Sequence, residues 1–172
     1  MDTPERSPGY VGWADQYDAW QRETIRRHGW ALQAVVGDED APPYVYTVGL
    51  TGFGHPELIV FATAQAAAAR LLNELGELVR RGQRLSAGER IGVRPADVHL
   101  LTFPEAEHWL FAAEDRYRLP GGPPVPALLV VPVDELEPSS DEDAQSDCCA
   151  HRVRPADARR RDLRHALGGG VR

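Results

Sequence analysis

The stretch at residues 42–61, PPYVYTVGLTGFGHPELIVF, constrains the fold most, because two strand-like segments flank a short glycine-rich turn. The alternation at 44–50 places Leu50 on the same face as Tyr46, and 57–61 consists of strand-forming residues. A third strand is predicted at 30–36. Since the connections are too short for crossover helices, we expect these three strands to pair as an antiparallel meander.

Two helices are predicted on either side of this meander in the chain. The first spans 15–28 and the second, which has a wide leucine stripe, spans 64–81. We interpret the aromatic stripe of the first helix as core packing rather than as a ligand-stacking surface. That stripe consists of Trp13, Tyr17, Trp20 and Thr24.

The second half of the domain adds shorter elements. A loop or short strand near Ile91 precedes predicted strands at 98–103 and 127–131, with a short helix at 104–117 between them. The strand at 127–131 is apolar without alternation, which predicts burial on both faces. The predicted fold class is α+β: a mostly antiparallel sheet with one long helix packed on a face and an N-terminal helix at an edge.

Composition changes after Pro132 and divides the chain. Residues 134–147 carry seven acidic groups and no basic one, whereas 151–172 carry seven arginines against two aspartates. The predicted organisation is a disordered lead at 1–12, one α+β domain at 13–136, an acidic linker at 137–150 and an Arg-rich tail at 151–172, with a short basic helix near 156–167. The opposite charges favour association of linker and tail over phosphate contact or a helix that orders on a partner.

Charge and hydropathy exclude several classes of protein. The net charge of -7 argues against nucleic acid as the main ligand of the domain. No apolar run approaches the roughly 20 residues that cross a bilayer. The N-terminus lacks the order of a secretory signal, so a cytoplasmic location is expected. The adjacent Cys148 and Cys149 form no disulfide framework, and no rigid scaffold is predicted to make them a metal or thiol site.

His55 and Glu57 are the first candidates for chemistry. They stand two apart at the start of a strand, so a regular strand would point both to one face. Such a pair suits acid–base work or metal ligation, with His99 or His108 completing the site. The alternative is a turn histidine that bonds backbone, and the local pattern favours it. No metal site is predicted.

A small pocket is the second candidate. Gly49 would form its floor and His55 its edge, with Tyr46 and Thr47 beside them. The alternative, which the pattern favours, is that the alanine-rich start of the long helix, at 66–69, packs on Gly49. Local signatures of nucleotide-binding loops, hydrolase elbows and zinc proteases are missing from the sequence.

Several spaced motifs resemble one family. They are Gly29-Trp30, the run DEDAPPYVYTVGL at 38–50, the run GHPELIVF at 54–61 and GQRLSAGER at 82–90. Together they resemble the bacterial domain-of-unknown-function family DUF4262. The resemblance implies no established activity, but the His-Pro-Glu element that it shares draws attention to His55 and Glu57.

The function predicted from the sequence lies between two classes. One is a non-catalytic interaction or accessory protein, of the toxin-immunity kind for example, whose acidic face meets another protein. The alternative is a small enzyme or ligand-binding protein whose pocket is lined by Tyr46, Thr47, His55 and Glu57. The first is favoured by small size, acidity and missing motifs. The sequence names no cofactor, substrate or partner.

Overall fold

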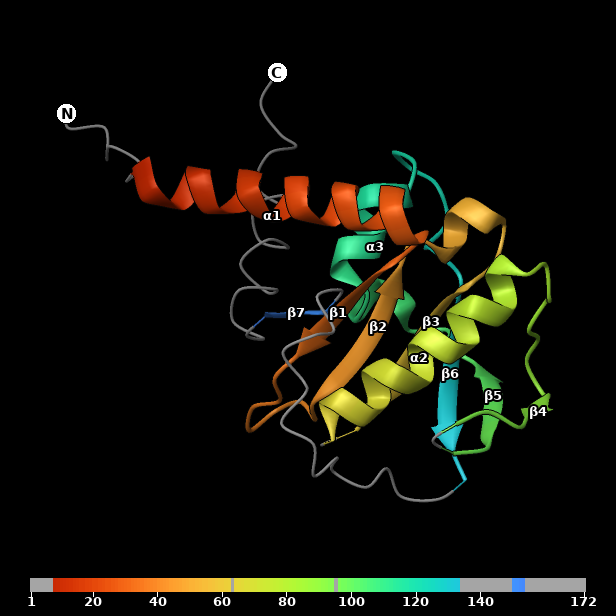
Figure 1. Ribbon diagram of the computed structural model, residues 1–172. Helices are drawn as coiled ribbons and strands as arrows, with labels where there is room; N and C mark the ends of the chain where they lie inside the picture. Colours follow the sequence, from red (N-terminus) through yellow and green to blue (C-terminus); the bar gives the residue numbers. More distant parts are fainter. Residues whose placement is uncertain (1–7, 63, 95, 134–149, 154–172) are drawn as a thin grey trace.

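The computed structural model describes residues 8–62, 64–94, 96–133 and 150–153, and Figure 1 shows one sheet with helices packed around it. The helices are α1 (Pro8–His28), α2 (Gln65–Arg80) and α3 (Phe111–Tyr117), with 3-10 helices η1 (Leu50–Phe53) and η2 (Ala106–His108). The strands are β1 (Ala31–Val35), β2 (Tyr44–Val48), β3 (Glu57–Phe61), β4 (Arg90–Ile91), β5 (Val98–Thr102), β6 (Ala127–Pro132) and β7 (Ala150–Val153).

The seven strands lie in the order β4-β5-β6-β3-β2-β1-β7. The predicted meander is confirmed, because β2 pairs antiparallel with both β1 and β3. The β4–β5 and β5–β6 pairs are antiparallel too, whereas β3–β6 and β1–β7 are parallel. The α+β class with a mostly antiparallel sheet is therefore confirmed.

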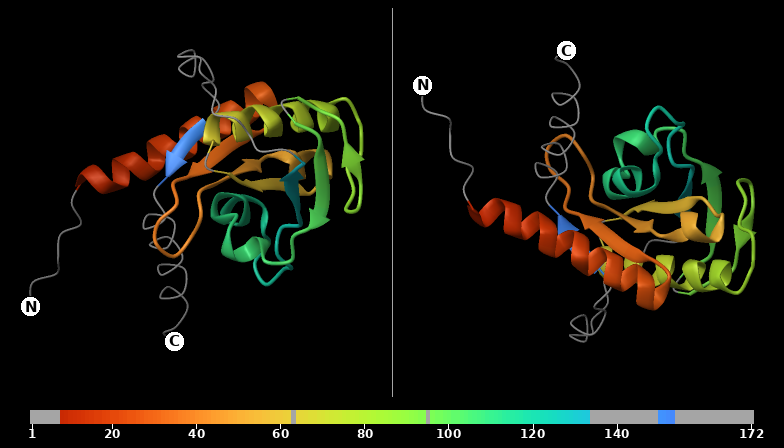
Figure 2. Two further views of the ribbon diagram at one scale, coloured as in Figure 1. Left: turned by 90° about the horizontal axis from the view of Figure 1, so that it is seen from below. Right: turned by 90° about the horizontal axis from the view of Figure 1, so that it is seen from above.

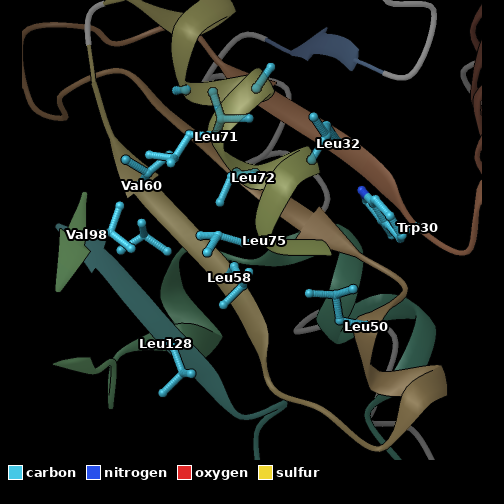
Figure 3. Close-up of a cluster of buried hydrophobic side chains, with 14 of the residues drawn as sticks. Trp30, Leu32, Leu50, Leu58, Val60, Leu71, Leu72, Leu75, Val98 and Leu128 are labelled. Carbon is cyan, nitrogen blue, oxygen red and sulfur yellow. The ribbon is translucent and has the colours of Figure 1, made fainter. Parts of the chain in front are cut away.

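One face of the sheet is covered by α2, as the leucine stripe predicts. Figure 3 shows Leu71, Leu72 and Leu75 of α2 reaching down onto the strands, and all three are fully buried. The Trp30 indole closes one end of this layer, where its Nε1 donates to Asn73 Oδ1 at 3.0 Å. A Cβ at Gly76 would lie 2.6 Å from that ring, so the close approach needs a glycine.

The opposite face is covered by α3 and η2, which Figure 2 shows on the far side of the sheet from α2. Two tyrosines of β2 anchor them. The Tyr46 hydroxyl accepts from the Ala112 N–H at 3.1 Å, and the Tyr44 hydroxyl donates to the Trp109 carbonyl at 3.2 Å. Each tyrosine has an apolar ring that fills the layer and a hydroxyl group that forms a hydrogen bond with the backbone of the covering helices.

Helix α1 runs beside β1, near the edge of the sheet as expected. Its Tyr17 hydroxyl donates to Gln33 of β1, and Gln21 donates to Tyr17 at 3.1 Å. Tyr17 and Thr24 are buried, which confirms core packing for these two members of the stripe, whereas Trp20 is only half-buried. The helix begins at Pro8 rather than at residue 15 or after a disordered lead, because proline suits the first turn of a helix.

Two expectations about element bounds are wrong, one for a strand and one for a helix. The strand predicted at 44–50 ends at Val48, since Gly49 has a φ of +139° that leaves extended geometry. Leu50 therefore turns to the α2 face, away from Tyr46. The segment predicted as one helix at 104–117 is likewise divided into η2 and α3.

The expected two-sided burial of β6 holds at Ala127 and Leu128 but is wrong at its far end. Leu128 and Val130 are buried beneath α2, but Val131 on the other face is 38% exposed. The short α3 does not reach this end of the sheet (Figure 2), so the end of β6 at Val131 is left exposed on one side. Apolar composition alone cannot reveal how far a covering helix extends.

The remaining predictions concern the chain ends. Cys148, Cys149, the acidic linker before 150 and the basic helix near 156–167 lie outside the described residues. The sequence analysis did not predict β7, which spans the boundary between the predicted linker and tail. In the described ranges, no helix is both long and apolar enough to span a bilayer.

Candidate functional site

The candidate site lies in the connection from β2 through η1 to β3. Gly49 makes this connection possible, because its backbone passes directly over the end of α1. A Cβ there would lie 2.6 Å from the Gly29 carbonyl oxygen and 2.7 Å from Trp30 Cα. The close neighbour of Gly49 is thus another backbone segment, rather than the alanine-rich start of α2 or a ligand.

Glu57, the first residue of β3, points back into this turn and is completely buried. Its carboxylate accepts five hydrogen bonds from three residues of the turn and from Thr47. Oε1 accepts from the Gly49 N–H at 2.9 Å, the Thr51 N–H at 3.0 Å and the Thr51 hydroxyl at 2.8 Å. Oε2 accepts from the Thr47 hydroxyl at 2.6 Å and the Leu50 N–H at 3.2 Å.

The donors around Glu57 form an anion-binding nest. Three successive N–H groups, those of residues 49–51, converge on one carboxylate, which is how backbone nests hold anions. Here the anion is the chain's own side chain. Thr47 extends the network, because its hydroxyl oxygen also accepts from the Leu58 N–H at 2.9 Å. The carboxylate therefore ties the turn to both strands.

Opposing effects act on the ionisation of Glu57. Burial raises the pKa of this carboxyl group, while the hydrogen bonds from Thr47, Thr51 and Gly49 lower it, and burial is the larger effect. Tyr117 of α3 is affected as well, because burial and then the negative charge of Glu57 raise the pKa of its hydroxyl.

His55 is held by backbone through both ring nitrogens. Its Nε2 accepts from the Leu85 N–H at 3.1 Å, so the ring proton must be on Nδ1, which donates to the Pro56 carbonyl at 2.7 Å. The ring is buried, 5% exposed. His55 therefore fastens the loop after α2 to the turn before β3.

The two residues of the His-Pro-Glu element have separate partners. No hydrogen bond in the described part of the chain joins the side chains of His55 and Glu57. His55 contacts the loop after α2, and Glu57 contacts the turn after β2. The two side chains therefore do not form the acid–base couple that a common face would have allowed. A catalytic role for the pair stays a prediction.

The other predicted residues are distributed over the fold. Tyr46 bonds α3, whereas Thr47 belongs to the Glu57 network. His99 on β5 and His108 in η2 are exposed, and His108 lies 3.7 Å from Glu107. In the described residues, no three His, Cys, Asp or Glu side chains are grouped to hold a metal ion.

Sequence reasoning missed Thr51, Leu85 and the backbone of 49–51. The spacing Thr-x-Gly-Leu-Thr before a buried Glu is the only feature in the sequence that points to a nest. Leu85 has no such indication, since its N–H meets His55 only after α2 has packed.

The family model of a domain of unknown function, DUF4262, matches residues 24–137. The chain belongs to the DUF4262 family. No curated protein and no solved structure matches it. The DUF4262 match includes the whole Glu57 network and His55, and it ends before β7. Two of the motifs that carry the family resemblance, 38–50 and 54–61, flank the β2–β3 turn and contain His55, Glu57 and Thr47.

A second candidate within the DUF4262 domain is an exposed apolar surface on the α3 side of the sheet. We define the open strip as Leu101, Val131 and Val133, which are 46%, 38% and 42% exposed. Its first two members lie on adjacent strands, since His99 pairs with Val131 and Leu101 with Leu129. The half-buried Leu129 lies opposite Leu101, and it packs against the core cluster beneath α3 as Phe61, Phe103 and Trp109 do.

Proposed function

We propose that this DUF4262 domain is a non-catalytic protein-interaction module that binds a partner protein through the open strip. The observation that supports the proposal is the exposure of Leu101 and Val131 on one sheet face. Burial of apolar surface is favourable by roughly 25 cal/mol for each Å² removed from water. A partner that covers these side chains would therefore stabilise the complex. An accessory or immunity-like role would need such a surface and no turnover.

The contacts of the His-Pro-Glu element support the same choice. A general base needs a lone pair that a substrate can reach. Both ring nitrogens of His55 and both oxygens of Glu57 already bond protein groups. The alternative, an enzyme or ligand-binding protein built on this pair, requires the network to open first.

The test compares two leucine variants of the full-length chain. Leu101→Glu places a charge in the open strip, whereas Leu119→Glu is the matched control, at a leucine that is 74% exposed and outside the strip. Each protein is used to capture and crosslink partners from cells that encode it. We expect wild type and Leu119→Glu to retain one common partner, and Leu101→Glu to bind it at least about tenfold more weakly.

Two results would contradict the proposal. Equal retention of the partner by Leu101→Glu would show that the strip is not the interface. A small molecule that co-purifies with wild type, is seen by native mass spectrometry and is lost in His55→Ala would favour the enzyme or ligand-binding alternative.

A further inference from the structure

The opposite edge of the sheet is completed by a strand from outside the family domain. β7 pairs in parallel with β1, from Leu32 opposite Ala150 to Val35 opposite Val153. Figure 1 shows β7 as the outermost strand beside β1. The DUF4262 match ends at residue 137, so the domain itself ends in β1, with a row of backbone N–H and C=O groups facing outward.

β1 is a rigid platform for such a pairing. All five of its residues are buried. Gln65 of α2 donates to the Val35 carbonyl at 2.7 Å, and Tyr17 of α1 donates to the side chain of Gln33. An edge that is already held in place loses little entropy when another strand is added to it.

Acidic residues lie beyond one end of the β1 edge. The pairing ends at Val35, and Asp38, Glu39 and Asp40 are exposed on the loop that follows it. An added parallel strand therefore runs toward this acidic loop. In this chain the sequence after Val153 is rich in arginine, with six arginines between 154 and 172. The sequence that follows β7 is thus complementary in charge to the loop.

We propose that the outer edge of β1 is an acceptor site for an extended peptide of a partner protein, and that residues 150–153 are its replaceable cover. The peptide pairs in parallel with β1 through main-chain hydrogen bonds, and basic residues follow its paired segment. This mode of binding is strand addition, with an additional contact between charged residues at one end of the strand. The proposal is independent of the open strip, which lies at the other end of the sheet.

The number of residues between β6 and β7 is sufficient for the pairing with β1 within one chain. β7 is separated from β6 by β3, β2 and β1, which is roughly 19 Å across the sheet. Residues 134–149 can extend to roughly 50 Å, so the cover reaches its site without strain. A competing peptide binds appreciably only when it is tighter or when the cover is weakened.

The test weakens the pairing of β7 with β1 by mutation and then adds the β7 sequence as a separate peptide. His151→Pro/Arg152→Pro removes ladder donors in the full-length chain, and Gln145→Pro/Ser146→Pro is the matched control outside β7. The probe is a labelled peptide of residues 150–161. We expect the first variant to bind it at least about tenfold more tightly than wild type or control. Binding should also slow hydrogen exchange at the amides of 31–35.

Charge and oligomeric state supply the remaining outcomes. The same peptide with Arg154 and 159–161 changed to glutamate should bind the open variant at least about threefold more weakly. No peptide binding by the open variant would overturn the proposal, as would unchanged exchange at 31–35. Dimerisation of the open variant without peptide binding would assign the edge to a second copy and also overturn it.

Discussion

The two faces of the sheet are covered unequally, although the same strands supply both. On the α2 face, Leu100 and Val130 are almost completely buried in one cluster with the leucines of α2, whereas their neighbours Leu101 and Val131 are 46% and 38% exposed on the other face. The short α3 covers the middle of that face only. The difference teaches that the α2 layer is closed over β5 and β6, while the α3 layer leaves apolar surface on these two strands exposed.

Leu100→Ala should have the largest effect, because it opens a cavity in the core on the α2 face. Leu100 is fully buried in that layer. We expect the free energy of unfolding to fall by about 3–5 kcal/mol, measured by urea denaturation. A loss below about 1 kcal/mol would contradict the difference between the two faces, since it would mean that the α2 face can relax around a missing side chain.

Glu57→Gln should have the next largest effect. The amide keeps the shape of the carboxyl group but turns an NH₂ group toward donors that need an acceptor. We expect a loss of about 2–3 kcal/mol. The loss should also depend on pH, because burial raises the pKa of Glu57 in the folded state above its ordinary value of 4.5.

The sign of that pH dependence follows from the raised pKa. The folded chain holds the proton more tightly, so the contribution of the carboxyl group is greatest below pH 4.5 and is lost as pH rises through the folded pKa. The gap in unfolding free energy between wild type and Glu57→Gln should therefore narrow from pH 4 toward neutrality. A widening gap would mean that the five donated hydrogen bonds outweigh burial.

Leu101→Ala should have the smallest effect on stability and sharpens the comparison with its neighbour. Leu101 is on the open face, so its truncation removes little buried area. We expect a change within about 0.5 kcal/mol in the same denaturation experiment. A loss close to that of Leu100→Ala would show that the open strip is covered within the chain, and would remove it as a candidate interface.

Sequence patterns were sufficient to predict the elements whose pairing or packing depends on local sequence. The alternation and short turn at 42–61 predict β2, β3 and their antiparallel pairing, which the structure confirms. The leucine stripe of α2 likewise predicts its buried face. These patterns work because the periods of helix and strand set which side chains share a face.

The candidate site was only half visible in the sequence. His55 and Glu57 could be singled out, and a turn histidine bonded to backbone was the favoured interpretation, in agreement with the contacts of His55. The five-donor nest around Glu57 could not be derived, because three of its donors are backbone N–H groups oriented by the positive φ of Gly49.

The sequence by itself determined the α+β class, the meander and the helix that covers it, because these depend on local periodicity and short connections. Only the tertiary structure decided which apolar residues stay exposed, which group His55 and Glu57 bond, and which strand closes the β1 edge. Each of these depends on segments distant in the chain, such as Leu85 meeting His55 and Ala150 meeting Leu32. Nothing in local composition records those encounters, since they arise from the packing of whole elements.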